Sequence, residues 1–177
     1  MPRRRKIPVF VSYAAKNAKI ANDLLDRFRD QAYASKNYNY VFWSDSEILI
    51  GEDWHKSIQE ALKKCKLGIL LVSPAFLGSE YISKNELPKF LGNKAKPVIP
   101  ILLQTVDFDL QNLKGLKKKQ FFRPDRASFI EIKAYTKYRG ETQKDEYAHK
   151  LFKKVEQRLN RIYTTKIRPT KSKKGVT

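Results

Sequence analysis

A chain of 177 residues with a hydrophobic fraction of 41% is long enough to form one domain with a buried core of its own. Its single cysteine excludes an internal disulfide and a cysteine-based metal site, and no apolar run reaches the roughly 18 residues that span a membrane. The short apolar stretch after the basic N-terminus also lacks the features of a signal peptide, so we expect a cytoplasmic protein without a membrane partner.

The formal net charge of +19 is concentrated at the two ends of the chain. Residues 150–177 hold ten Lys or Arg against one Glu, and residues 1–6 hold four basic residues. Such charge can hold nucleic acid or an acidic partner, or can simply be solvated. Because few aromatic residues are interleaved with it, we favour solvation and do not expect nucleic acid as a partner. We divide the chain into a basic extension (1–6), one domain (7–165) and a basic, disordered tail or linker (166–177).

Strands and helices alternate along the first part of the chain. Residues 8–13 predict a buried strand, and residues 17–31 predict a helix with one apolar face and Asn17 as its N-cap. Residues 40–43 predict a second strand, and residues 44–53 a long loop. The next apolar residues recur at i, i+4, i+7, i+8 and i+11, which indicates an amphipathic helix from Trp54 to Cys65 capped by Asp53.

The nearly all-apolar run 67–72 is typical of a strand buried on both faces of a parallel sheet, and residues 79–91 predict the helix after it. Residues 96–103 predict a fourth strand, in which Pro100 favours a bulge or an edge position. Residues 129–132 predict a short fifth strand, and the spacing of Tyr147, Leu151, Val155, Leu159 and Ile162 predicts a last helix. We therefore expect an α/β fold, a flavodoxin-like parallel sheet of four to five strands with helices on both faces.

Most standard catalytic motifs are absent from the sequence. It contains no Gly-rich phosphate loop and no GxSxG elbow, and its two histidines lie far apart, so we expect no metal site. What remains is Glu86, a carboxylate of the helix that begins near the carboxyl end of the central strand, where open α/β sheets bind ligands. The stretch Ser83-Lys84-Asn85-Glu86 also has the S-x-x-E pattern of a capping box, which gives Glu86 a purely structural alternative.

Four stretches occur in an order that resembles the conserved boxes of a Toll/interleukin-1 receptor (TIR) domain, with the resemblance strongest to prokaryotic members. They are PVFVSY, WSDSEILIGEDWHKSIQEAL, LGILLVSPAFLGSEYISKNELPKF and VIPILL. Members of this family are either adaptor scaffolds or enzymes that cleave the nicotinamide–ribose bond of NAD+, some of them cyclising the ADP-ribose. The resemblance implies a TIR fold, NAD+ as substrate, no cofactor, and Glu86 as the essential glutamate.

The resemblance also implies further site residues. The BB loop of the family, which shapes substrate access and self-association, falls on residues 45–53, and its assembly residues would be Ser46, Glu47, Ile48, Leu49, Ile50 and Gly51. The substrate contacts would be Ser12, Tyr13, Ala14, Trp43, Asp45, Tyr81 and Ile82. Many catalytic members carry tryptophan where this chain has Ile82, so either the substrate would bind more weakly here or another aromatic residue would supply the surface that stacks on it.

Two functions follow from the resemblance and stay open at this point. The first, which we favour, is an NAD+ nucleosidase that depends on self-assembly, acts in antiviral defence by analogy and works with a separate or fused sensor or effector. The second is a non-catalytic adaptor that acts through TIR–TIR contacts.

Overall fold

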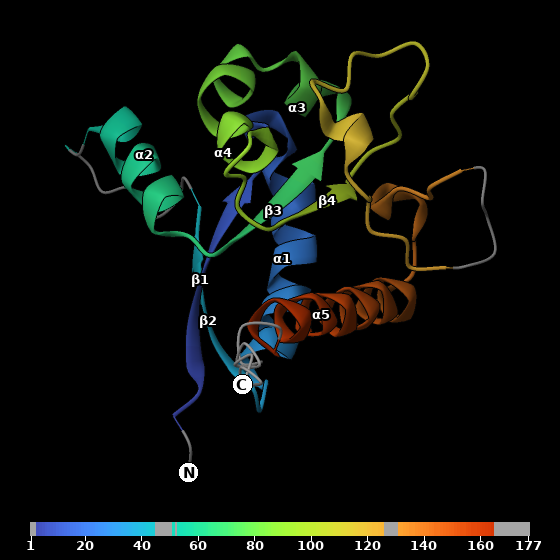
Figure 1. Ribbon diagram of the computed structural model, residues 1–177. Coiled ribbons are helices and arrows are strands. Elements are labelled where there is room, and N and C mark those ends of the chain that lie inside the picture. Colours follow the sequence, from blue (N-terminus) through green and yellow to red (C-terminus); the bar gives the residue numbers. More distant parts are fainter. Residues whose placement is uncertain (1–2, 45–50, 52, 126–130, 165–177) are drawn as a thin grey trace, which may run out of the picture.

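The computed structural model of the chain describes residues 3–44, 51, 53–125 and 131–164. Within these ranges, four parallel strands form one sheet in the order β2-β1-β3-β4 (Figure 1). The strands are β1 (Arg5–Ser12), β2 (Tyr38–Trp43), β3 (Leu67–Val72) and β4 (Val98–Leu102). Consecutive strands are added on one side of β1 and then on the other, which confirms the flavodoxin-like arrangement and creates a switch point between β1 and β3.

Helices cover both faces of this sheet (Figure 1). The long helices α1 (Ala18–Tyr33) and α5 (Glu141–Thr164) enclose one buried cluster against the strands. A second cluster on the other face is enclosed by α2, α3, η3 and α4, which span Trp54–Lys64, Pro74–Gly78, Ile82–Glu86 and Pro88–Leu91. Three short 3-10 turns complete the described helices: η1 (Ala15–Asn17), η4 (Leu116–Lys118) and η5 (Tyr135–Lys137).

Local chemistry explains the elements that the sequence predicts well. All six residues of β3 are buried, as expected for a strand covered on both faces. Its Gly68 permits the close approach of α4, because a Cβ there would lie 2.4 Å from the Phe90 ring. The carboxylate of Asp53 accepts a hydrogen bond from the Lys56 backbone N–H, which confirms Asp53 as the cap of α2. Pro100 is confirmed in an edge strand, since β4 ends the sheet.

Two predictions are confirmed only in part. Residues 80–91 are largely helical, but they form the π turn η3 and then α4 instead of one regular helix, and the separate helix α3 precedes them. Asn17 occupies the cap position before α1, but its side chain makes no capping hydrogen bond and turns instead toward Ser73 and Gln104.

Several expectations concern segments that the structure does not describe. Half of the predicted fifth strand lies there, because residues 126–130 are outside the described ranges, and its other two residues, Glu131 and Ile132, lie in irregular structure. The predicted tail, 166–177, is outside them too, whereas β1 begins at Arg5, inside the expected extension. None of the helices in the described ranges is long and apolar enough to cross a membrane.

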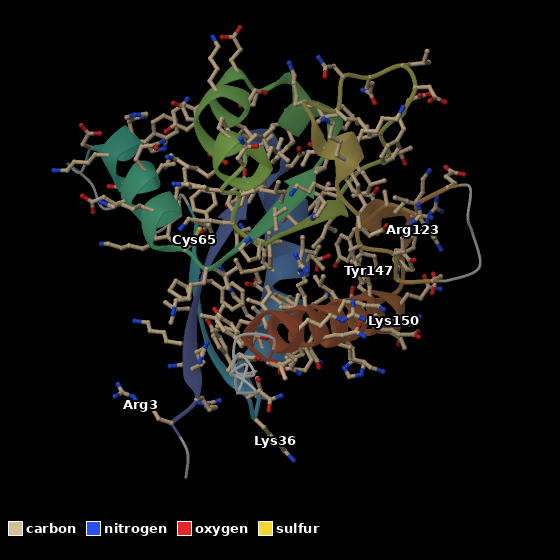
Figure 2. The ribbon with its side chains drawn as sticks, in the orientation of Figure 1. Arg3, Lys36, Cys65, Arg123, Tyr147 and Lys150 are labelled. Atoms are coloured by element: carbon tan, nitrogen blue, oxygen red, sulfur yellow. The ribbon has the colours of Figure 1, made fainter. Side chains whose placement is uncertain are left out.

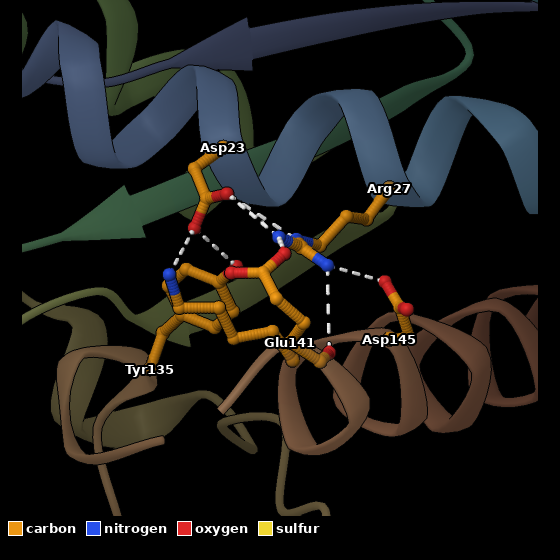
Figure 3. Close-up of polar contacts among 6 residues, drawn as sticks. Asp23, Arg27, Tyr135, Glu141 and Asp145 are labelled. Atoms are coloured by element: carbon orange, nitrogen blue, oxygen red, sulfur yellow. Dashed lines mark hydrogen bonds and ion pairs between the residues drawn. The ribbon is translucent and has the colours of Figure 1, made fainter. Parts of the chain in front are cut away.

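A cluster of hydrogen bonds and ion pairs connects α1 to α5 (Figure 3). The guanidinium of Arg27 on α1 pairs with Glu141 and Asp145 on α5, and lies 3.2 Å from Asp23. Asp23 also accepts a 2.8 Å hydrogen bond from the Tyr135 hydroxyl, and the Lys144 ammonium lies 2.9 Å away. Partial burial acts to raise the pKa of Asp23, but the hydrogen bonds from Lys144 and Tyr135 outweigh it and hold that pKa below its ordinary value.

Candidate active site at the switch point

Glu86 is a buried carboxylate beside the carboxyl end of β1. Its side chain is 4% exposed, and Oε2 accepts a hydrogen bond from the hydroxyl of Ser12, the last residue of β1 and itself 3% exposed. The register pairs Ser12 with Leu70 of the neighbouring β3. The two side chains therefore meet at the switch point between β1 and β3, where an open parallel sheet forms its ligand crevice.

A local irregularity of the helix positions Glu86. In η3 the Leu87 N–H donates to the carbonyl of Ile82, five residues back, at 3.0 Å, which is the π-helical pattern. Pro88 follows directly and has no N–H to donate, so the helix cannot continue with its regular bonds. Single π turns of this kind are frequent at functional sites.

The capping-box alternative for Glu86 is wrong. Ser83 lies within η3, and its hydroxyl donates to the carbonyl of Ser79 at 2.9 Å, as it would inside a helix. The hydroxyl of Ser79 accepts from the Ile82 N–H at 3.3 Å and thus acts as the cap. The Glu86 carboxylate reaches across to another element instead of back to its own helix start.

A chain of buried polar side chains supports the same edge of the sheet. The Ser73 hydroxyl, directly after β3, donates to Asn17 Oδ1 at 2.7 Å, and Asn17 Nδ2 donates to Gln104 Oε1 at 3.1 Å. These bonds join the beginning of α1 to the segments that follow β3 and β4. Sequence reasoning did not select Asn17, Ser73 or Gln104 as site residues, although a small polar residue directly after an all-apolar strand was a signal for Ser73.

An aromatic cluster lies between the start of α2 and the helical segment of Glu86. The rings of Trp54 and Tyr81 are 4.3 Å apart, and the Tyr81 hydroxyl lies 3.0 Å from His55 Nδ1. Trp54 is 47% exposed, so it is not the core residue that the helical periodicity predicts. Ile82, at the position of the family's tryptophan, is buried in the second core cluster.

The remaining predicted substrate contacts are distributed over both faces of the sheet. Trp43, at the end of β2, stacks on Phe10 with ring centroids 5.1 Å apart and packs against the same core cluster as Ala14 and Ile82. Tyr13 packs against the other cluster, between the sheet and the helices α1 and α5. The structure thus brings Ser12, Ala14, Trp43, Tyr81 and Ile82 to the face that carries Glu86, and turns Tyr13 toward the opposite one.

Most of the expected BB loop falls outside the described residues. This applies to Asp45, Ser46, Glu47, Ile48, Leu49 and Ile50. Gly51 is described and exposed, with φ at +90°, a left-handed conformation that favours glycine. Among the described residues, no three His, Cys, Asp or Glu side chains are grouped as a metal site. Burial raises the pKa of the Cys65 thiol, which is therefore protonated and unreactive near neutral pH.

Comparison with known proteins agrees with the architecture. A family model described as a TIR domain matches residues 9–132, which include the second half of β1, the whole of β2, β3 and β4, η3 and the Ser12–Glu86 pair. A search of the curated proteins finds no match. Because the matched region covers well over half of the chain, the chain belongs to the TIR-domain family.

Proposed function

We propose that this TIR domain cleaves the nicotinamide–ribose bond of NAD+, with Glu86 as the catalytic carboxylate and ADP-ribose or its cyclic form as product. The observation that carries the proposal is the burial of Glu86 at the switch-point crevice, where the Ser12 hydroxyl holds its carboxylate. A carboxylate buried in this way requires donors to stay charged, and a structural residue at a helix start gains nothing from such burial.

Cleavage of this bond requires the protein to supply little more than one oriented negative charge. When the bond breaks, its electron pair returns to the pyridinium nitrogen, so nicotinamide leaves as a neutral molecule and needs no proton. Positive charge develops on the ribose, as in glycoside hydrolysis. The Glu86 carboxylate stabilises that charge and accepts hydrogen bonds from the ribose hydroxyls, while water or another nucleophile completes the reaction.

Trp54 and Tyr81 are our candidates for the stacking surface. The two rings pack together, and Trp54 is half exposed at the start of α2, whereas Ile82 is buried. Planar aromatic ligands stack well on such rings. We assign Ser12 and Ala14 to the wall beside Glu86, and we keep Trp43 and Asp45 as further proposed contacts; Tyr13 packs on the opposite face and is no longer a candidate.

Assembly is the second part of the proposal. TIR domains commonly self-associate, and Trp54 exposes apolar surface directly after the loop that the family uses for such contacts. We propose that copies assemble through this region, residues 46–51 included, and that assembly completes the site. The setting we propose is cytoplasmic antiviral signalling, by analogy with the family, with a separate or fused sensor or effector.

The exposed Trp54 also favours a second function. A half-exposed tryptophan fits a contact between copies as well as it fits a ligand. In that case the protein is a non-catalytic adaptor that works through TIR–TIR contacts, and the buried Ser12–Glu86 pair is structural.

The decisive experiment compares NAD+ consumption by wild type, Glu86→Gln and Glu80→Gln at high protein concentration, with the products separated. Glu80 is exposed, lies six positions before Glu86 and pairs only with Lys84 among the described residues, so it controls for loss of a nearby charge. We expect Glu86→Gln to abolish turnover and Glu80→Gln to retain it. The product then separates a hydrolase from a cyclase.

The other outcomes are equally informative. Wild type that consumes no NAD+ even when light scattering shows assemblies supports the adaptor. Turnover that survives in Glu86→Gln means that another residue carries the chemistry.

A further inference from the structure

Basic side chains gather at the end of the sheet where the strands begin, opposite the end that carries Glu86. A groove of about 1130 Å³ lies there between the start of β4, residues 119–125 and the C-terminal half of α5. The basic residues that line it are Lys96, Lys119, Arg123, Lys154, Arg158 and Arg161. Asp125 is the one acidic residue among the described lining, and Lys150 Nζ lies 3.0 Å from its carboxylate and offsets its charge.

One wall of the groove presents its charges at a regular spacing. Lys154, Arg158 and Arg161 of α5 are all exposed and follow one another at i, i+4 and i+7, so they share one face of the helix. At about 1.5 Å per residue, this row spans roughly 10 Å. A strand of duplex nucleic acid carries one phosphate per about 3.4 Å of helix axis, so the row extends over about three phosphate intervals.

The other walls add charge from parts of the chain that are distant in sequence. Lys119 and Arg123 come from the segment after η4, and Figure 2 shows Arg123 on the side of the molecule where α5 carries Lys150. The Lys96 ammonium donates hydrogen bonds to the carbonyls of Lys63 and Cys65, each at 2.7 Å. It therefore contributes to the groove only through its positive electrostatic potential.

A second basic pocket extends this surface. It is lined by Arg3, Arg4, Arg5, Lys6 and Asn39, at the starts of β1 and β2, and has a volume of about 580 Å³. The Arg5 guanidinium lies 4.0 Å from the centre of the Tyr163 ring in the last turn of α5, two residues beyond Arg161. The basic surface thus continues from the groove along α5 to the first strand, where Figure 2 labels Arg3.

Size and chemistry together favour one class of ligand. The groove exceeds the roughly 300–1,000 Å³ of typical small-molecule pockets. Phe121 and Phe122 on its lining are buried, so the described lining offers positive charge but no exposed ring on which a base could stack. We infer that this groove binds the phosphate backbone of nucleic acid independently of sequence, at a site separate from the Glu86 crevice.

The test measures binding of a short fluorescent DNA duplex to the full chain by anisotropy over a series of salt concentrations. Because the whole protein is strongly basic, the variant Lys154→Gln/Arg158→Gln is compared with Lys56→Gln/Lys63→Gln, which removes the same charge from exposed positions on α2. Wild type and both variants share the basic tail (166–177), so its contribution to duplex binding is the same in each and does not affect the comparison. Circular dichroism verifies that each variant is folded.

Loss of two phosphate contacts is expected to lower the slope of log K against log salt by about 1.8, at about 0.9 per contact. Across a fourfold rise in salt, the affinity of wild type then falls roughly tenfold more than that of the groove variant. The α2 variant keeps the slope of wild type, and duplexes of different sequence bind alike.

Three results overturn the inference. Equal loss of slope in both variants assigns the binding to diffuse charge. Displacement of the duplex by inorganic tripolyphosphate at equal phosphate concentration makes the groove a site for small polyphosphates. Failure of the wild-type protein to bind the duplex leaves an acidic protein surface as the partner that this charge fits.

Discussion

The Ser12 hydroxyl and the Glu86 carboxylate are both almost fully buried, and each satisfies the other. An isolated carboxylate in such a place favours its neutral form, whereas a donated hydrogen bond favours the charged form. At the scale of single residues, the proposed function therefore makes Ser12 a positioning residue, whose hydroxyl orients the Glu86 carboxylate and favours its charged form.

Replacing Ser12 by alanine tests this role within the proposed function. Hydrogen bonds to charged groups contribute about 1.5–3 kcal/mol, so Ser12→Ala should lower kcat roughly ten- to a hundredfold while KM changes less. Ser12→Thr keeps the hydroxyl and should recover part of the rate. Steady-state kinetics on the two variants measures both effects.

Ser83→Ala is the matched control, because it removes a hydroxyl from η3 that bonds only to the Ser79 carbonyl among the described contacts. Equal losses of kcat in Ser12→Ala and Ser83→Ala would contradict a specific role for Ser12. A thermal melt of each variant separates loss of rate from loss of fold.

At the scale of elements, the sequence predicts the sheet better than it predicts the helical segment that carries Glu86. The all-apolar run of β3 and the helix periodicity of α2 each specify one structure, and both are confirmed. After β3, however, Ser73 caps an additional helix, α3, that was not predicted, and the predicted helix is divided into η3 and α4 next to Pro88. The spacing of apolar residues does not reveal such caps and breaks, although Pro88 within residues 79–91 indicated that the helix would be interrupted.

The site could be predicted only in part for a related reason. The position of Glu86 after the central strand follows from the strand–helix alternation alone. Its contact with Ser12, 74 residues away, depends on how β1 pairs with β3 and on the π turn, and neither has a local sequence signal. Tyr13 is a different case, because the alternation along β1 is a local signal and places Tyr13, directly after the strand, on the face opposite Glu86.

The contact between α1 and α5 predicts a loss of stability in acid. The pKa of Asp23 is lower in the folded chain than its ordinary value of 3.8, because hydrogen bonds that favour the carboxylate outweigh its burial. The stabilisation is complete above the unfolded pKa near 4 and disappears as the pH falls through the lower, folded value. The free energy of unfolding of wild type should therefore exceed that of Asp23→Asn most near neutral pH, and the difference should shrink below about pH 4.

Urea titrations at a series of pH values measure this difference. Asp30→Asn, which removes an exposed carboxylate from the same helix, gives the baseline. A difference between wild type and Asp23→Asn that stays constant down to pH 3 would show that the charge of Asp23 does not contribute through this cluster.

At the scale of the whole molecule, the fold separates two kinds of surface at the two ends of one parallel sheet. Counting charges along the sequence places the excess at the chain termini and favours a solvated tail. Folding places Lys119 and Arg123, from the middle of the chain, beside the basic face of α5, so the groove has no signature in the sequence alone. Glu86 lies at the other end, where the strands end, so nucleic acid in the groove would not lie against it.

This separation leads to a prediction that depends on both proposals. If copies must assemble to act and each copy holds a duplex through its groove, a long duplex gathers several copies and raises their effective concentration. NAD+ turnover at low protein concentration should then rise with added duplex, reach a maximum and fall again, because excess duplex spreads the copies over separate molecules. Lys154→Gln/Arg158→Gln should lose this maximum but keep its turnover at high protein concentration, where assembly needs no template. Turnover that is unaffected by duplex in wild type would mean that the groove does not serve assembly, whereas turnover that is absent at every protein concentration would count against the proposed enzyme itself.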